Sequence, residues 1–235
     1  MAFKGLNRNI IKIIALISMT IDHIGYMLFP EIEVLRILGR LAYPIFAYMI
    51  AEGCTYTKHK LRYFLLCFVI GIGCSLVYYF NDKSIYLCIL LTFSLSIAII
   101  YSIQLLMKKI EGQAKPYIIY GCLLLTLALV GLAYFLGYPP SSFAKYNFQI
   151  DYGFFGILTP VIIYLMPNKQ LRIFALALGT FGLVIDFGGI QWYAFLAIIP
   201  LVLYNGQKGR FNLKYLFYIY YPLHLVAIYG IGLLI

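Results

Sequence analysis

A long apolar stretch near the N-terminus, residues 10–29, reads IIKIIALISMTIDHIGYMLF. A membrane-spanning helix needs about 20 mostly apolar residues, and this stretch supplies them. Polar side chains interrupt it at Thr20, Asp22 and His23, and Arg36 and Arg40 follow in the next apolar stretch. Each ionisable group inside hydrocarbon costs roughly 2.5–3.5 kcal/mol on insertion scales, so such groups usually serve a purpose. The stretch therefore predicts a membrane-spanning helix that carries part of a polar site.

The whole chain has the composition of an integral membrane protein. Of its 235 residues, 63% are hydrophobic and 11% are charged, whereas soluble domains carry about 25% charged residues. Apolar runs separated by Pro, Gly and charged residues predict an all-α bundle of nine membrane-spanning helices in a single domain, residues 1–235. The predicted spans are 10–29, 34–53, 62–80, 85–107, 117–137, 151–166, 170–187, 190–204 and 215–234. We do not expect the first to be a cleavable signal peptide, because it is long and lacks a small-residue cleavage site.

The basic residues are distributed unevenly between the two sides of this bundle. One side holds 14 of the 18, Lys83 and Lys145 lie on the other, and Arg36 and Arg40 lie within the second span. The positive-inside rule then predicts a cytoplasmic N-terminus and an external C-terminus. Because the basic residues follow the membrane topology, the net charge of +10 does not indicate a nucleic-acid partner. The basic loops could only set the topology and contact lipid headgroups, or they could also bind a phosphorylated cofactor. The 14 are Lys4, Arg8, Lys12, Lys58, Lys60, Arg62, Lys108, Lys109, Lys115, Lys169, Arg172, Lys208, Arg210 and Lys214.

The polar residues of the first two spans are predicted to share one layer of the membrane. A helix rises about 1.5 Å per residue, which places His23 and Arg40 each about 9 Å below the outer edge. Arg36 and Arg40 share a helix face, while Asp22 and His23 diverge by about 100°. We therefore expect Asp22 to neutralise an arginine rather than to orient His23. The alternative is a buried charge network that only joins the two helices.

Three further ionisable residues are candidates with simpler alternatives. Glu52 ends the second span about 18 Å along the helix from Arg40, and could be a simple interfacial charge. His224 follows Pro222, which predicts a kink, and a neighbouring tyrosine could satisfy it. Asp151 could be the N-cap of the sixth span.

The cysteines are predicted to be small apolar fillers rather than metal ligands. Their number is odd and none has the spacing of a metal site, so we expect no metal. They are Cys54, Cys67, Cys74, Cys88 and Cys122.

Several motifs together resemble the TraX family of membrane proteins. The resemblance covers nearly the whole chain, and its first block is the most specific. The motifs are MTIDHIG at 19–25, LRILGRLAYPIFAY at 35–48, AEG at 51–53, DYG at 151–153, LYNG at 203–206 and YLFYIYYPLHL at 215–225. One departure lies in the fourth span, where an Asn followed by a Thr-containing run is expected and IYLCILLTF stands at 85–93.

The resemblance implies an acetyltransferase of the bacterial cytoplasmic membrane. The named member of the family is similar to an enzyme that acetylates the N-terminal amine of conjugative pilin, and the family resembles multispan enzymes that use cytoplasmic acyl-CoA. Those enzymes rely on a membrane-embedded histidine and nearby arginines, which points to His23 with Arg40 and Arg36. The acceptor does not carry over, and could be a protein N-terminus or a small molecule. The motifs add further candidate site residues, namely Glu52, Asp151, Asn205, Tyr221 and His224.

The chemistry of acetyl transfer fits these residue types. A neutral histidine can remove the acceptor proton, and Arg40 could stabilise the charge that develops on the thioester carbonyl or bind an anionic part of a substrate. We favour direct transfer, with an acyl-Cys54 route as a remote alternative. The expected donor is acetyl-CoA, and the first candidates for its phosphates are Lys58, Lys60, Arg62, Lys208 and Arg210.

Two other classes of function remain open on the sequence. One is a transporter of small solutes or lipids with the buried Asp, His and Arg residues along its path, although no inverted repeat is visible. The other is an assembly partner without catalysis. Binding of CoA and slow hydrolysis of acetyl-CoA would distinguish the enzyme from both.

Overall fold

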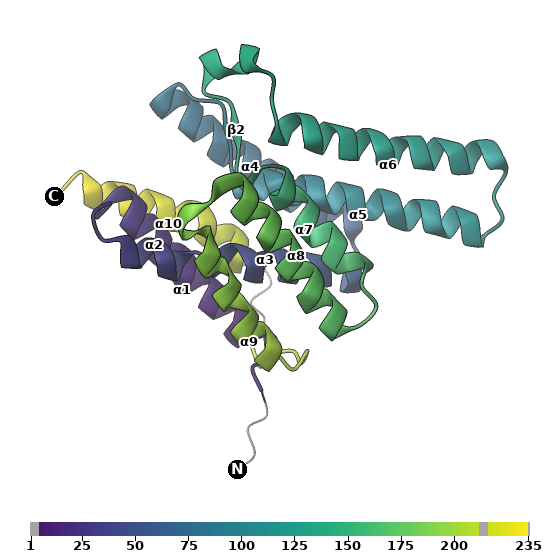
Figure 1. The fold of residues 1–235 in the computed structure, drawn as a ribbon, viewed down its shortest axis with the longest axis horizontal. Helices are drawn as coiled ribbons and strands as arrows, with labels where there is room; N and C mark the ends of the chain where they lie inside the picture. Colours follow the sequence, from purple (N-terminus) through teal and green to yellow (C-terminus); the bar gives the residue numbers. More distant parts are fainter. Residues whose placement is uncertain (1–4, 212–215, 235) are drawn as a thin grey trace. The chain divides into compact units, whose positions relative to one another are not determined.

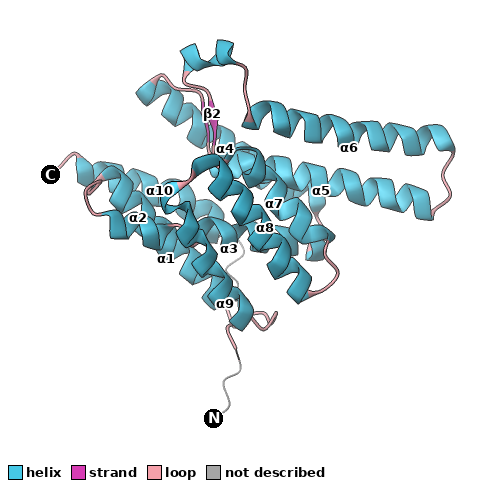
Figure 2. Ribbon diagram, viewed as in Figure 1, coloured by secondary structure: helices cyan, strands magenta, loops and turns pink. Residues whose placement is uncertain are grey.

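The computed structural model describes residues 5–211 and 216–234, and the surroundings of their side chains apart from residues 81, 82 and 144. Helices dominate the described chain, and the predicted all-α class is confirmed (Figure 2). Four residues that bear on these predictions lie outside the described residues. They are Lys4 and Lys214, which enter the charge count, Tyr215, which is the first residue of the predicted last span, and Ile235, which follows that span.

The chain divides into two compact units. Unit 1 comprises Met1–Met49 with Lys169–Ile235, and unit 2 comprises Ile50–Asn168. Unit 1 therefore combines the N-terminal and C-terminal parts of the sequence. The first boundary between the units falls inside helix α3 (Ala42–Tyr56).

Unit 1 holds the polar residues of the first two predicted spans. Its elements, besides the first part of α3, are α1 (Arg8–Met27), α2 (Glu33–Gly39), α8 (Lys169–Phe187), η2 (Gly189–Ala197), α9 (Ile198–Leu203) and α10 (Leu216–Gly232). Helix α1 begins where the Asn7 side chain accepts hydrogen bonds from the backbone N–H groups of Asn9 and Ile10, which satisfies donors that the first turn leaves free. Helix α1 packs against α2 and α10 (Figure 1). The 3-10 helix η2 packs against α2 and α8.

Unit 2 is organised around helix α5 (Ile89–Glu111). This helix packs against α4 (Lys60–Asp82), α6 (Pro116–Gly137) and α7 (Gly153–Leu165), and α5 and α6 lie side by side as a long pair (Figure 1). Two short strands, β1 (Tyr86–Leu87) and β2 (Gln149–Ile150), pair in parallel, and the 3-10 helix η1 (Ser141–Tyr146) precedes β2. Buried hydroxyls join α5 to α7, since Ser96 donates to the Ile157 carbonyl at 2.7 Å.

Six helical segments of the described chain are long and apolar enough to cross a membrane. They are Arg8–Met27, Glu33–Tyr56, Lys60–Phe80, Ile89–Glu111, Pro116–Gly137 and Lys169–Phe187. Three shorter apolar segments, Gly153–Leu165, Gly189–Leu203 and Leu216–Gly232, coincide with the remaining predicted spans. The protein is therefore a helical membrane protein, and the count of nine crossings stays a prediction.

The predicted second span, 34–53, is not one continuous helix. It is divided at Arg40 and Leu41 into α2 and α3. Pro44 has no N–H group, so it cannot donate to the carbonyl of Arg40 four residues earlier, and its ring crowds that carbonyl. The break places Arg40 at the C-terminal end of α2, where its backbone N–H donates to the Arg36 and Ile37 carbonyls.

Two other predicted spans also differ from continuous α-helices. The fourth, predicted from residue 85, begins with β1 and becomes helical at Ile89. The eighth, 190–204, is a 3-10 helix before it turns into α9. Gly188 and Gly189 adopt positive φ angles of 57° and 52° at its start, and Pro200 cannot donate to the Leu196 carbonyl. Tighter 3-10 turns accommodate both constraints.

Candidate functional site

Asp22 lies between the two arginines of the cluster. Its Oδ2 atom accepts a hydrogen bond from Arg36 Nη1 at 2.8 Å, and its Oδ1 atom accepts from Arg40 Nη2. Arg36 Nη1 also donates to the Asp22 backbone carbonyl at 3.1 Å. The ion pair predicted for Asp22 is therefore present, and it is made with both arginines rather than one.

The two arginines differ in their surroundings. The side chain of Arg40 is 9% exposed and that of Arg36 is 24% exposed. Arg40 donates through Nε to the Arg36 carbonyl at 3.3 Å and through Nη1 to Gln191 Oε1 at 3.2 Å. Arg36 instead places its guanidinium 5.0 Å from the centre of the Tyr26 ring, which is largely exposed. Arg40 is thus the fixed member of the pair, and Arg36 the more accessible one.

Gln191 is a site residue that the sequence analysis did not identify. It is buried in η2, and its amide oxygen accepts from Arg40 across 151 residues of sequence. A polar amide in the apolar run after Gly188 and Gly189 was the available signal. Its partner could not be inferred, because nothing local links η2 to α2.

Glycines allow α1 and α2 to approach closely. A Cβ atom added to Gly39 would overlap the Asp22 carboxylate, and one added to Gly25 would lie 2.7 Å from Leu35 Cβ. Small residues at helix contacts are typical of membrane proteins, where close backbone approach supplies much of the packing. The contact brings the α2 arginines within reach of Asp22.

His23 meets His224 rather than Asp22. Its Nδ1 atom lies 2.8 Å from the Met19 carbonyl oxygen and 3.3 Å from His224 Nε2. The two rings are perpendicular in an edge-to-face contact, with centroids 4.9 Å apart. Asp22, Arg36 and Arg40 all lie within electrostatic range of His23. The cluster therefore contains two histidines beside the charged triad, and His224 joins the site that was predicted around His23.

Tyrosines of α10 surround the second histidine. The Tyr220 ring stacks on His224 with centroids 5.2 Å apart and planes inclined by 5°. The Tyr220 hydroxyl shares a 2.6 Å hydrogen bond with the Thr20 hydroxyl of α1. Tyr221 is buried, and its ring centre lies 5.7 Å from that of His224. The suggested tyrosine contact of His224 is present, and His224 Nδ1 also hydrogen bonds to the Tyr220 backbone carbonyl at 2.9 Å.

Comparison with known proteins shows which family this chain belongs to. The family model described as TraX protein matches residues 7–232. The chain belongs to the TraX family. The family resemblance predicted from the motifs is thereby confirmed, and the match covers every residue of the polar cluster.

Two proteins share different lengths of sequence with this TraX protein. It is 24% identical over 250 aligned positions to the probable fimbrial assembly protein FimC, serogroup H1, of Dichelobacter nodosus, which covers 93% of this chain and 92% of that protein. It is 35% identical over 71 residues to an uncharacterized protein of Rickettsia prowazekii, and there the chain spans only 28% of its relative. No solved structure matches the TraX chain significantly.

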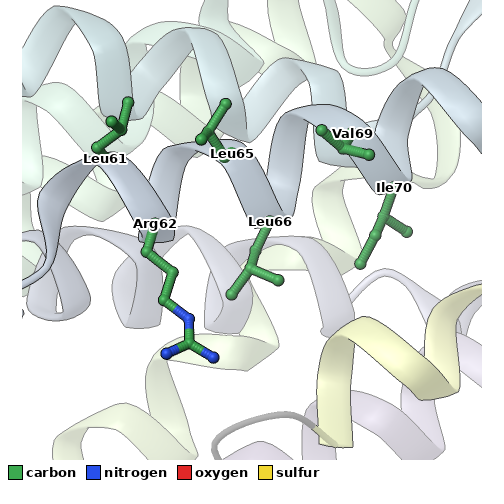
Figure 3. Close-up of a pocket in the computed structure, with 6 residues that line it drawn as sticks. All are labelled: Leu61, Arg62, Leu65, Leu66, Val69 and Ile70. Carbon is green, nitrogen blue, oxygen red and sulfur yellow. The ribbon is translucent and has the colours of Figure 1, made fainter.

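The basic residues predicted to bind CoA phosphates fall in both units of the TraX protein. In unit 2, Lys58 and Lys60 are exposed. Lys60 already engages Gln104 Oε1, and its ammonium group lies 5.3 Å from the centre of the Tyr101 ring. Arg62 lines a shallow groove along α4 whose other lining residues are all apolar (Figure 3). Such a groove suits lipid or an acyl chain better than a phosphate, and no residue of the polar cluster lines it.

The remaining basic candidates lie in a loop of unit 1. Lys208 and Arg210 are exposed there. Asn205 is structural in this loop, because its backbone N–H donates to the Leu6 carbonyl and its side chain accepts from the Gln207 N–H, both at 2.9 Å. The loop thus anchors the segment that precedes α1.

Glu52 and Asp151 both belong to unit 2 and do not have the simple roles suggested for them. Glu52 is 7% exposed, which argues against a simple interfacial charge. The N-cap interpretation of Asp151 is wrong, because Tyr152 occupies the N-cap position of α7 and makes no side-chain cap. Asp151 instead joins β1 to α5, since its N–H donates to the Leu87 carbonyl and its carbonyl accepts from the Thr92 hydroxyl.

Within the described ranges, no group of three or more His, Cys, Asp or Glu residues is arranged to hold a metal ion. The arrangement in unit 1 instead combines a histidine pair, fixed guanidinium groups and one carboxylate inside an apolar helical unit. Chemically, this combination can accept a proton, hold an anion and stabilise developing negative charge.

Proposed function

We propose that this TraX protein is a membrane acetyltransferase that moves an acetyl group from cytoplasmic acetyl-CoA to an amine or hydroxyl acceptor. The observation that carries the proposal is the contact between His23 and His224 beside the Asp22–Arg36–Arg40 network. A histidine that accepts protons and a fixed arginine are the two parts that direct acyl transfer needs.

His23 is the general base in this proposal. It takes the proton from the acceptor nitrogen or oxygen as that atom forms a bond to the acetyl carbon. The thioester C–S bond then breaks, and the departing CoA sulfur receives the proton from His23. After the new bond forms and before the C–S bond breaks, Arg40 stabilises the negative charge on the carbonyl oxygen. Its hydrogen bonds to Asp22, Gln191 and the Arg36 carbonyl fix its guanidinium in place.

The donor would bind through its phosphates to exposed basic residues. Lys58 and Lys60 lie close together in sequence in unit 2, and Lys208 and Arg210 lie in the loop of unit 1. Phosphate oxygens form strong, charge-assisted hydrogen bonds with such side chains. Arg62 is the weaker candidate, because its groove is otherwise apolar.

The acceptor belongs to the chemical class of amines and hydroxyls, with the N-terminus of a pilus protein as the first candidate. Its support is the family membership together with the relative that is named a probable fimbrial assembly protein. A small molecule of the cell envelope remains the other candidate.

We further propose nine membrane crossings with a cytoplasmic N-terminus, in the cytoplasmic membrane of a bacterium. The uneven distribution of basic residues supports this orientation. It places the predicted CoA ligands on the side where acetyl-CoA is made.

The purified protein in lipid nanodiscs provides the test. It should bind CoA and slowly hydrolyse acetyl-CoA in the absence of an acceptor. Cells with and without the protein are then compared by mass spectrometry of envelope proteins and metabolites for the gain of one acetyl mass. A folded protein that neither binds CoA nor changes any acetylation state would contradict the proposal and favour a transporter.

A further inference from the structure

Helices α1 and α10 meet through two polar contacts on neighbouring turns. Thr20 and His23 lie one turn apart on α1, and Tyr220 and His224 lie one turn apart on α10. The hydroxyl pair Thr20–Tyr220 forms one contact, and the imidazole pair His23–His224 forms the other. The stacked Tyr220 ring therefore fixes the plane of His224 from the side of the hydroxyl contact.

The hydrogen-bond partners assign the proton on each neutral ring. A backbone carbonyl can only accept, so the nitrogen that faces it must carry the hydrogen. His23 Nδ1 faces the Met19 carbonyl at 2.8 Å, and His224 Nδ1 faces the Tyr220 carbonyl at 2.9 Å. Both rings are then protonated at Nδ1, and both Nε2 atoms carry a lone pair.

This assignment gives the two histidines different roles. The lone pair of His224 Nε2 is directed at His23 Nδ1, 3.3 Å away, so the His23 hydrogen is shared between Met19 and His224. Across residues 5–211 and 216–234, His23 Nε2 has no hydrogen-bond partner. Only His23 can therefore offer a lone pair to a substrate.

We propose that His224 is a positioning residue that holds His23 in the Nδ1–H tautomer and so leaves the His23 Nε2 lone pair open to the acceptor. The kinetic consequence of this inference rests on the proposed function. When Nε2 takes the acceptor proton, the positive ring keeps two hydrogen-bond acceptors at Nδ1, the Met19 carbonyl and His224 Nε2. The hydrogen at Nδ1 stays in place throughout, and the acceptor proton passes from Nε2 to the CoA sulfur.

The tautomer can be measured without any activity. The chain has three histidines, and the exposed His59 can be replaced by His59→Gln, so that solid-state NMR of the full-length protein in liposomes with ¹⁵N-labelled histidine reports on the pair alone. We expect two neutral rings at mildly alkaline pH, both protonated at Nδ1, with a cross-peak between the His23 Nδ1 hydrogen and His224 Nε2. An Nε2–H tautomer of His23, or the absence of that cross-peak, overturns the proposal.

Kinetics then test the positioning role. His224→Leu should lower kcat about tenfold, the effect of one hydrogen bond lost in the transition state, with an unchanged KM for acetyl-CoA. His224→Gln offers an amide oxygen to the same hydrogen, and should retain most of kcat even if the leucine variant folds poorly. Unchanged kcat in a folded His224→Leu protein overturns the positioning role while the proposed function stands. A wild-type protein that transfers no acetyl group overturns the proposed function alone. The NMR spectrum then still shows whether His23 is protonated at Nδ1 and hydrogen bonded to His224.

Discussion

Gly39 lies directly against the carboxylate of Asp22, so that no side chain fits between α2 and the anion of the cluster. The glycine thus determines how near the arginines of α2 come to α1. The cluster depends on this contact as much as on its charges.

Gly39→Ala should therefore destabilise the protein by about 1–3 kcal/mol, the usual cost of overpacking. The added methyl group must displace Asp22 or separate the helices. Thermal unfolding in detergent measures the loss. Gly230→Ala in α10 is the matched control, because a Cβ atom there meets no heavy atom within 4 Å. Equal stability of the two variants would contradict this account of the contact.

Asp22→Asn should lower the free energy of unfolding by about 3 kcal/mol, at the low end for a broken buried ion pair because Arg36 retains some exposure. The substitution leaves two guanidinium groups next to each other without their shared anion. Arg36→Gln should cost less than Arg40→Gln, since Arg40 is the more buried partner and also engages Gln191. A larger loss of stability in Arg36→Gln than in Arg40→Gln would show that side-chain exposure does not determine which ion pair contributes more to stability.

Gln191→Leu should cost about 1–3 kcal/mol, because Arg40 Nη1 loses its buried acceptor. Acetyl transfer should fall as well, since Arg40 becomes less fixed. Gln170→Leu changes an exposed glutamine of α8 in the same way and should leave both stability and transfer unaltered. The comparison needs unfolding curves and initial rates for the two variants.

His23→Ala should lose at least about 100-fold in acetyl transfer, the low end for removal of a general base. Expression and CoA binding should persist, because His23 is not among the predicted phosphate ligands. His59→Ala is the control, since His59 is exposed at the start of α4. Near-normal transfer by folded His23→Ala would move the base to His224 or Glu52. Full activity of His23→Ala, His224→Ala and Glu52→Ala alike would end the acyltransferase proposal.

Reporter fusions test the nine crossings. Fusions after Lys60 and Lys169 should read cytoplasmic, and fusions after Lys83, Lys145 and the C-terminus should read external, because the basic loops stay inside. A cytoplasmic C-terminus would require an even number of crossings and would contradict the count.

The approximate positions of most helices and the ion pair of Asp22 follow from the sequence alone. Long apolar runs between Pro, Gly and charged residues locate the helices, because hydrocarbon requires every backbone group to be satisfied within a helix. The rise per residue places Asp22, Arg36 and Arg40 in one layer of the membrane, and a short connection makes their helices neighbours. The break at Arg40 was also available from the sequence, since Pro44 leaves that carbonyl without its helical donor.

The distant residues that complete the site are set by tertiary packing. His224 meets His23 across 201 positions, and Gln191 meets Arg40 across 151. The helices of this chain are apolar over most of their surface, so the pattern of apolar residues does not mark which face of each helix meets which neighbour. Packing of side chains against small residues and interhelical hydrogen bonds select those neighbours in a membrane. These interactions form only when the whole unit assembles, which is why the partners of His23 and Arg40 could not be read from their own segments.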